Sequence, residues 1–463
     1  MFLDVKLAVD VALNMKNSMA RRYRKKKLPT EPITVEIESL SHEGRGVARH
    51  DGKTIFVGGA LPGETVEMQY VFQRGKFDEG KTINVLSPSA ERVDPPCEKF
   101  SVCGGCSMQH LSTDAQLAHK ASILEEQLTH FAKVQPEEWL PPMQADLLGY
   151  RRKARLGVRY VIKKERTLIG FREKYSNFLT DIETCPVLIE RVSNLLMPMN
   201  QLIDGLQIRQ FIPQIEVANG DDKTALIVRH LKPMLEEDVK KWVEFGQAHN
   251  LVIYLQPKGP DTIHRIWPHD EEGAQLSYRL PEFDVELLQA PLDFAQVNAS
   301  INRKMVPFAI ELLDVQPEDE VLDLFCGLGN FTIPLATKAK RVVGVEGVDE
   351  MVERGKVNAK HNGLSNVEFY QADLTTDLSE KPWVNRNYNK VLIDPARSGA
   401  LEVIANIVKF SPEKIVYVSC NPATLARDTG ELVKNGYKLK KAGVMDMFPH
   451  TTHVESIALF EKS

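Results

Sequence analysis

The segment VLDLFCGLGNF, residues 321–331, decides the fold of the C-terminal part of this 463-residue chain. Its apolar run carries Asp323 and ends in a turn that contains Gly327 and Gly329. Glycine lets the backbone turn sharply and approach a ligand closely. A dinucleotide-binding fingerprint would place a third glycine near Thr332 and would not place an acid inside the strand, so the segment argues against an NAD site.

Apolar runs alternate with helical stretches from about residue 299 to the C-terminus, which predicts a doubly wound, mainly parallel α/β sheet. The runs are VLDLF, VVGVE, VEFYQAD, KVLIDPA, KIVYVSC and SIALFEK. The second run ends at Glu346, where a carboxylate can hold both ribose hydroxyls, and the third ends at Asp373, near the expected place of an adenine. This order of acid, glycine turn, acid and acid resembles class I methyltransferases, whose S-adenosylmethionine lies at the carboxyl ends of these strands.

A candidate reacting centre follows the next two strands. The fourth strand ends at Asp394-Pro395 and the fifth at Cys420-Asn421-Pro422. A lone buried cysteine is usually an inert small hydrophobe, which is what we expect of Cys326 in the glycine turn. Cys420 differs because it leaves its strand at the carboxyl edge, beside the expected methyl donor. The position predicts a nucleophile.

A thiolate at this edge suits methylation of uracil at C5, because C5 is too weak a nucleophile to take a methyl group unaided. Addition of the thiolate to C6 makes C5 nucleophilic, which is covalent catalysis. A base must then remove the C5 proton before the cysteine can leave. Glu455, in the segment HVES before the last strand, supplies a carboxylate. His450 and His453 are less favoured alternatives, because histidines near a sheet edge are often structural.

The motifs SCNP, DPAR and HVES, with DFAQVN at residues 293–298, resemble those of the uracil-C5 RNA methyltransferase family. The resemblance implies that Cys420 is the nucleophile and Glu455 the general base. It also implies a set of residues around S-adenosylmethionine and the target base: Gln296, Phe325, Asn330, Glu346, Asp373 and Asp394.

A cysteine cluster stands earlier in the chain, in the segment CEKFSVCGGCSMQH. Cys97, Cys103 and Cys106 have the spacing C-x5-C-x2-C, and Cys185 can supply a fourth thiolate. Four thiolates suit either zinc or an iron–sulfur cluster, and the spacing does not decide between them. The CGGCxxQH motif resembles the 4Fe–4S site of the same family, so we favour a cluster that is structural or helps to bind RNA.

The chain is predicted to have four parts. Residues 1–28 form a basic tail that we expect to be disordered. Residues 29–88 have short glycine-punctuated strands that predict an OB-like β-barrel, and their wording resembles the TRAM RNA-binding module. Residues 89–298 form a central α+β domain with the iron–sulfur segment, and residues 299–463 form the class I S-adenosylmethionine-dependent methyltransferase domain. The central domain includes a helix from Ser112 to Phe131, with Ser112 as its cap and a buried apolar stripe of Leu117, Ile123, Leu124 and Leu128. Within the family, this combination resembles the enzymes that methylate 23S ribosomal RNA.

Composition limits the partners. The net charge of -5 argues against indiscriminate coating of nucleic acid, but basic runs at Lys16–Lys27 and Arg151–Arg159 favour local phosphate contacts. We expect 23S ribosomal RNA as partner, with the target uridine unpaired or flipped out. The absence of a long apolar run and of a secretory signal predicts a cytoplasmic protein without a membrane span, and we expect a monomer. The six cysteines should therefore be reduced.

Three alternatives remain open. The first is a transfer RNA uracil-C5 methyltransferase, although such relatives lack the barrel and the cluster cysteines. The second is a radical S-adenosylmethionine methylthiotransferase, whose cluster needs C-x3-C-x2-C. The third is a non-catalytic RNA-binding protein, against which the intact Cys420 and Glu455 argue. An exocyclic-amine methyltransferase is disfavoured because DPAR lacks the aromatic residue that would stack on the base.

Overall fold

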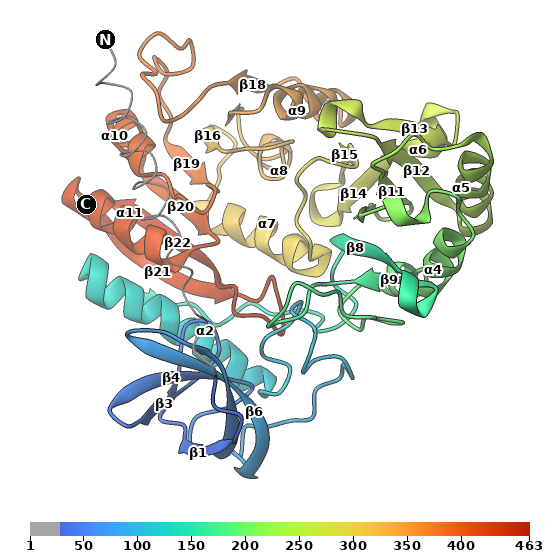
Figure 1. Cartoon of the computed structure of the whole chain (residues 1–463). Coiled ribbons are helices and arrows are strands. Elements are labelled where there is room, and N and C mark those ends of the chain that lie inside the picture. Colours follow the sequence, from blue (N-terminus) through green and yellow to red (C-terminus); the bar gives the residue numbers. More distant parts are fainter. Residues whose placement is uncertain (1–27) are drawn as a thin grey trace, which may run out of the picture. The chain divides into compact units, whose positions relative to one another are not determined.

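The computed structural model describes residues 28–463, which form two compact units (Figure 1). One contains residues 28–41 and Arg45–Ala90, and the other contains His42–Gly44 and Glu91–Ser463. The predicted tail lies almost wholly outside the described residues, as does its basic run. No helix in the described part of the chain is long and apolar enough to cross a membrane. The division at residues 298 and 299 stays a prediction.

The smaller unit is the six-stranded sheet of the predicted TRAM barrel, in the order β1-β5-β6-β4-β3-β2. Side chains alternate between buried and less buried along its strands, as the alternating sequence predicts. Its core consists of small and branched apolar residues such as Ile55, Val57 and Val66. The strands are β1 (Ile33–Glu36), β2 (Ser39–Leu40), β3 (Gly46–His50), β4 (Lys53–Gly58), β5 (Thr65–Gln73) and β6 (Phe77–Ser87).

The central part of the larger unit contains a second six-stranded sheet, in the order β13-β12-β11-β10-β8-β9, of which only β11 and β12 pair in parallel. Helices α4 and α5 pack on it. Its strands are β8 (Lys153–Val161), β9 (Arg166–Gly170), β10 (Gln214–Asn219), β11 (Thr224–Arg229), β12 (Leu251–Gln256) and β13 (His264–Trp267). Its helices are α3 (Glu190–Ser193), α4 (Leu196–Asp204), α5 (Glu236–His249) and α6 (Glu271–Ala274), and the hairpin β14 (Leu276–Leu280) with β15 (Val285–Gln289) follows.

The C-terminal sheet has eight strands in the order β18-β17-β16-β19-β20-β22-β21-β7. The first five are parallel, which confirms the predicted doubly wound α/β fold. The strands are β16 (Glu320–Leu324), β17 (Arg341–Glu346), β18 (Val367–Gln371), β19 (Lys390–Ile393), β20 (Lys414–Ser419), β21 (Tyr437–Met445) and β22 (Glu455–Lys462). Because helices cover both faces, the parallel strands are almost continuously apolar.

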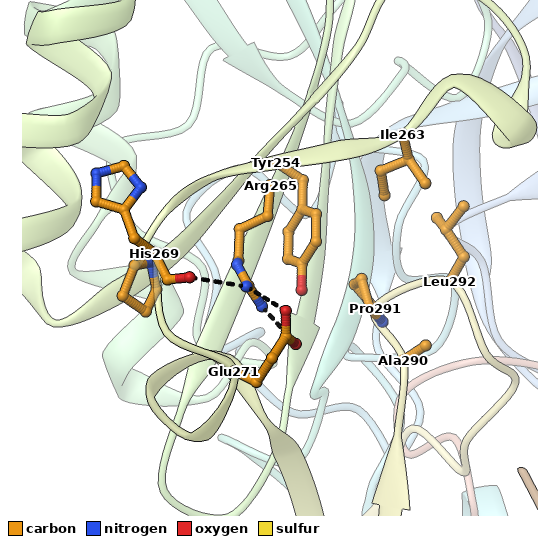
Figure 2. Close-up of a pocket in the computed structure, with 9 residues that line it drawn as sticks. Tyr254, Ile263, Arg265, His269, Glu271, Ala290, Pro291 and Leu292 are labelled. Carbon is orange, nitrogen blue, oxygen red and sulfur yellow. Dashed lines mark hydrogen bonds and ion pairs between the residues drawn. The ribbon is translucent and has the colours of Figure 1, made fainter.

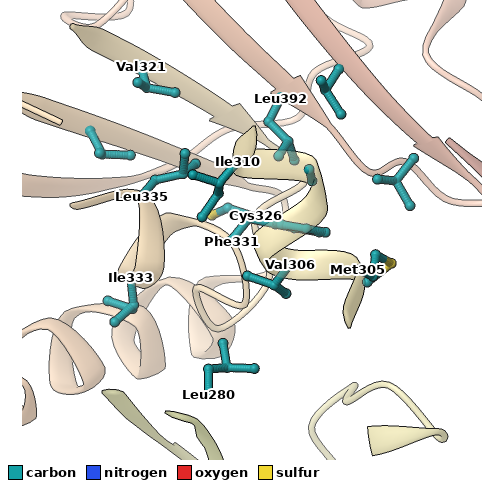
Figure 3. Close-up of a cluster of buried hydrophobic side chains, with 14 of the residues drawn as sticks. Leu280, Met305, Val306, Ile310, Val321, Cys326, Phe331, Ile333, Leu335 and Leu392 are labelled. Carbon is teal, nitrogen blue, oxygen red and sulfur yellow. The ribbon is translucent and has the colours of Figure 1, made fainter. Parts of the chain in front are cut away.

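Two buried clusters hold the helices to the two faces of this sheet. One joins α7 (Ala299–Leu313), α8 (Thr332–Ala336) and α9 (Asp349–His361) to the strands and to the β14–β15 hairpin, with Val306, Ile310 and Leu335 among its members (Figure 3). The other joins α10 (Leu401–Phe410) and α11 (Pro422–Lys434) to the strands. The carboxyl ends of the strands are thereby left as the edge at which polar loops gather.

Helix α2 (Thr113–Gln127) continues into a short π-helical turn, Leu128–Ala132, and belongs to the second of these layers. The Ser112 side chain accepts a hydrogen bond from the Ala115 amide at 3.3 Å, so the predicted cap is confirmed. The predicted apolar stripe is also buried, including Leu124. The helix packs on α11 and β21, and the short strand β7 (Glu138–Trp139) pairs with β21. Residues 113–139 therefore pack with the C-terminal sheet, although they precede the central strands in the chain.

Candidate active site

The register of the last strands brings Cys420 next to Glu455. Strands β20 and β22 pair antiparallel, and Ser419 lies opposite Ser456. The Ser456 hydroxyl donates to the Ser419 carbonyl at 3.3 Å. Strand β20 ends where the antiparallel strand β22 begins. Cys420, which follows β20, therefore lies beside Glu455, the first residue of β22. Asp394 follows β19, the other neighbour of β20, so all three predicted residues lie at one edge.

A pocket of about 300 Å³ opens beside Cys420. Arg397 and His453 line it from the two loops of the sheet edge. Helix α2 contributes Ile123 and Gln127 to its wall, so a helix that precedes the central strands in sequence helps to shape the space over the thiol.

Burial raises the pKa values of Asp394, Glu455 and Cys420. It raises the pKa of Asp394 to about 7. For Glu455, burial and the neighbouring Asp394 raise the pKa to about 8, while Arg397 and Lys120 oppose the shift. Burial is the main cause that raises the pKa of the Cys420 thiol to about 11. The charges of Glu455 and Asp394 add to the rise, while Arg397 opposes it. At neutral pH the thiol is therefore protonated in the unliganded protein, and Arg397 is the cation that favours its ionisation.

Arg397 is a functional residue that sequence reasoning passed over, although it stands in the quoted DPAR motif. Its Nη2 lies 3.1 Å from His453 Nδ1. Since a guanidinium can only donate, Nδ1 must accept and the imidazole is then neutral, with its proton on Nε2. Burial, Arg397 and Lys120 all lower the pKa of His453. The Arg397 carbonyl accepts from the Asn421 side chain at 3.0 Å, which ties the fourth-strand loop to the start of α11.

The glycine turn presents the predicted cofactor edge. Phe325, Gly327 and Gly329 all have positive φ angles, of 63°, 55° and 101°. A Cβ on Gly329 would lie 2.9 Å from Cγ1 of Ile333, so both conformation and space require glycine there. The Glu346 side chain, at the end of β17, accepts a hydrogen bond from the Gly327 amide at 3.1 Å. It also accepts hydrogen bonds from the amides of Gly347 and Val348, the two residues after Glu346.

Asp323 lies fully buried inside β16 beneath this turn. Its Oδ2 accepts from the Thr332 hydroxyl at 2.5 Å, whereas Oδ1 has no partner among the described atoms. Burial, then Asp394 and Glu346, raises the pKa of Asp323 to about 8. A cluster of acids with raised pKa values would favour a bound cation, such as a sulfonium or an ammonium group.

The other predicted cofactor residues have different surroundings. Asn330 exchanges two amide hydrogen bonds of 2.9 Å with Asn302 and accepts a third from the Tyr278 hydroxyl. Its side chain therefore holds the glycine turn to α7 and to the β14–β15 hairpin. Asp373 is exposed after β18 and accepts from the Thr375 amide and hydroxyl, which lower the pKa of Asp373. Gln296 is half-buried in the segment between β15 and α7.

The four cysteines predicted to bind metal are reduced and lie near one another. Burial raises the pKa of Cys106 to about 12, and the charges of Cys185, Cys103 and Cys97 add to the rise. The Cys185 thiol is therefore within electrostatic range of the thiols of residues 97–106. Among residues 28–463, no group of three or more His, Cys, Asp or Glu side chains is arranged to hold a single metal ion. The gathering of the thiols suits a four-thiolate ligand set, but the cluster itself stays a prediction.

Two further features bear on the sequence predictions. A larger pocket of about 560 Å³ lies in the central part, around Tyr254, Arg265 and Leu292, and none of the predicted site residues lines it (Figure 2). The second basic run is less available to phosphates than its sequence indicates. Arg152 pairs with Asp221 at 2.5 Å, and Arg155 pairs with a carboxylate of β10 at 3.0 Å.

Comparisons with known proteins agree with this geometry. Residues 112–463 match the tRNA (Uracil-5-)-methyltransferase family, and residues 26–69 match the TRAM domain. The 23S rRNA (uracil(1939)-C(5))-methyltransferase RlmD of Alcanivorax borkumensis is 54% identical over 96% of this chain and 99% of its own length. RlmD of Francisella tularensis subsp. novicida is 51% identical over 96% of this chain and 100% of its own length.

A solved structure extends the likeness to the fold. The Pyrococcus abyssi tRNA (uracil-54, C5)-methyltransferase in complex with S-adenosyl-L-homocysteine is 25% identical, covers 92% of this chain and 100% of its own, and superposes with a TM-score of 0.70. With three quarters of its length matched by the family and its strand order that of the expected fold, the chain belongs to the tRNA (Uracil-5-)-methyltransferase family.

Proposed function

We propose that this protein transfers a methyl group from S-adenosylmethionine to C5 of a uridine in 23S ribosomal RNA, through a covalent bond between Cys420 and C6. The observation that carries the proposal is the β20–β22 register, in which Cys420 lies beside Glu455, together with the pocket that opens beside Cys420. The relatives that are named as 23S rRNA methyltransferases are identical to this chain at more than half of the aligned positions. They match nearly its whole length, including the barrel.

The Cys420 thiol loses its proton to solvent, and Arg397 favours the resulting thiolate. Addition of its sulfur to C6 moves the C5–C6 electron pair so that C5 becomes nucleophilic. S-adenosylmethionine, when bound, would supply an electrophilic methyl group to C5, with S-adenosylhomocysteine as the leaving group. Glu455 then takes the proton from the methylated C5, the C5–C6 double bond re-forms, and the bond between Cys420 and C6 breaks. Glu455 suits this step because its raised pKa of about 8 makes it a stronger base than an exposed carboxylate.

The residues at the glycine turn suit the methyl donor. Glu346, at the end of β17, would accept hydrogen bonds from the ribose hydroxyls, and Asp373, just after the neighbouring β18, would lie on the adenine side. A bound cation would lower the raised pKa values of Asp323 and Asp394 and so favour their ionisation beside it. Asn330, already bonded to its neighbours, would act by keeping the turn in place.

The pocket of about 300 Å³ beside Cys420 is at the small end of ligand pockets, which fits one nucleobase better than a stacked pair. A base inside a duplex cannot expose C5 and C6 to a thiol and a methyl donor together. The target uridine should therefore be unpaired or flipped out of its stack.

We further propose that Cys97, Cys103, Cys106 and Cys185 hold a 4Fe–4S cluster with a structural role. Their mutual proximity supports a four-thiolate site, which zinc would also fit. We assign RNA gripping to the TRAM barrel, and we expect a cytoplasmic monomer, as proposed from the sequence.

The decisive experiment compares two RNAs in one assay. Purified protein is incubated with methyl-labelled S-adenosylmethionine and either a 23S fragment that contains the site named in its relatives or a transfer RNA transcript. We expect label at C5 of one uridine of the 23S fragment. Label in the transfer RNA alone would favour the transfer RNA enzyme, and label in neither would refute the proposal. Mass spectrometry of ribosomal RNA from cells that lack the gene should show the loss of one 5-methyluridine.

A further inference from the structure

The segment that leads from β21 to Glu455 is held by a buried ion pair. Lys120, on α2, places its Nζ 2.6 Å from Oδ1 of Asp446, and both side chains are only 1% exposed. The same Nζ donates to the Phe448 carbonyl at 3.0 Å. One ammonium group thus fixes both the side chain and the backbone at the start of this segment.

Further contacts hold the segment at His450, a non-glycine residue with a φ of 65°. The His450 amide donates to Gln116 of α2 at 3.0 Å. The His450 carbonyl accepts from the amides of Ser107 and Met108 at 2.9 and 3.0 Å. A left-handed conformation at a bulky residue persists only where the surroundings enforce it. At His450 the contacts that enforce this conformation come from α2 and from the residues directly after Cys106.

A buried ion pair is weak evidence for stability, because taking two charges out of water costs much of what their attraction returns. Lys120 nevertheless lies where its charge acts on Glu455. Asp394 and Arg397 are the other charged groups that act on Glu455, and the Cys420 thiol faces the same edge. His453, two residues before Glu455, bonds to Arg397 and also faces Lys120.

We propose that Lys120, through its ion pair with Asp446, is a positioning residue that holds the Asp446–His453 segment so that Glu455 can remove the C5 proton. The proposal rests on the proposed function, since it concerns the release step of that reaction. It assigns α2, far from the motifs in sequence, a part in a single step of the chemistry.

The test separates adduct formation from adduct decay with Lys120→Met. Single-turnover reactions with a 23S fragment are stopped with denaturant, and the covalent protein–RNA adduct is measured by its shifted gel mobility. We expect the adduct to form at the wild-type rate and to decay on the order of 100-fold more slowly, the cost expected for a misplaced catalytic group. The rise of the decay rate with pH should also move to higher pH, because loss of a nearby cation raises the pKa of Glu455.

Two reference variants make the result interpretable. Glu455→Gln should accumulate the adduct, and if it does not, the proposed mechanism fails whatever Lys120 does. Lys390→Met removes another buried lysine, which lies at the amino end of β19, away from Asp394, and pairs with Glu413 at 3.3 Å. It should leave adduct decay unchanged. Accumulation in Glu455→Gln without accumulation in Lys120→Met would overturn only the present inference.

Lys120→Gln guards against misfolding, because its amide can still donate to Asp446 and Phe448 while the charge is lost. We expect adduct decay closer to the wild-type rate than in Lys120→Met, because the segment is still held, together with the same shift of the pH profile, because the charge is lost. Equal slowing of adduct formation and decay would overturn the inference, because it would indicate general damage. Loss of the native melting transition in both Lys120 variants, with Lys390→Met still folded, would also overturn it, since Lys120 would then be a determinant of folding.

Discussion

Cys420 and Cys106 are both reduced thiols whose pKa values are raised, in each case first by burial, yet their neighbours differ. Cys420 faces two carboxyl groups and an arginine at a sheet edge. Cys106 faces three further thiols. The direction of a pKa shift therefore does not separate a reactive thiol from a ligand thiol. The chemical identity of the neighbours does, since acids and a cation can move protons whereas a set of thiols suits the proposed cluster.

The largest effect should come from Cys420→Ala, which removes the atom that bonds to C6. We expect methyl transfer to fall on the order of 10⁴-fold or more, as for other covalent nucleophiles. Labelled methyl incorporation into a 23S fragment measures it, with thermal melting as the folding control. If Cys420→Ala keeps near-normal turnover, the assignment of the two thiol environments is reversed or wrong. Its iron content should equal that of the wild type.

The opposite pattern is expected for Cys185→Ser. Loss of one of four thiolates should reduce the iron content from about four per chain toward zero and lower the melting temperature, because Cys185 joins the cysteine segment to the central part of the chain. Iron and sulfide analysis of anaerobically purified protein measures the first effect and calorimetry the second. Stoichiometric zinc without iron in the wild-type protein would contradict the cluster.

Substitution of Arg397 tests whether a neighbouring cation makes Cys420 more reactive than the clustered thiols. Arg397→Gln should slow adduct formation by about 10-fold, because loss of the cation raises the pKa of Cys420 and lowers the fraction of thiolate. Arg397→Lys keeps the charge, so its rate of adduct formation should lie between those of the wild type and Arg397→Gln. Rapid-quench measurement of the adduct gives the rate. An unchanged rate in Arg397→Gln would show that burial and the acids alone set the reactivity of Cys420.

The smallest effect is a pH dependence. Glu455 acts only as the carboxylate, so adduct decay should increase with pH as the group ionises around its pKa of about 8. The expected gain between pH 7 and pH 9 is about tenfold. Adduct decay in Glu455→Gln should not follow this profile. A wild-type decay rate that falls over the same range would point to a group that must be protonated, and therefore away from Glu455 as the base.

Local sequence determined much of the fold and of the candidate site. The cap at Ser112, the glycine turn at Gly329 and the acid at the end of β17 are short-range features, because backbone conformation and strand ends depend on neighbouring residues. The placement of Cys420 and Glu455 at the ends of strands was also readable, since parallel strands in a doubly wound sheet share one carboxyl edge.

Only the tertiary structure decided which distant groups meet there. The sequence did not identify β21 or β7, whose polar or very short runs lack a clear strand pattern, and it did not show that α2 lies over the C-terminal sheet. The pairing of Lys120 with Asp446 joins residues 326 positions apart, and Arg397 acts on Cys420 across a loop. Such contacts depend on how layers pack, and burial then sets the pKa values, so neither can be read from spacing along the chain.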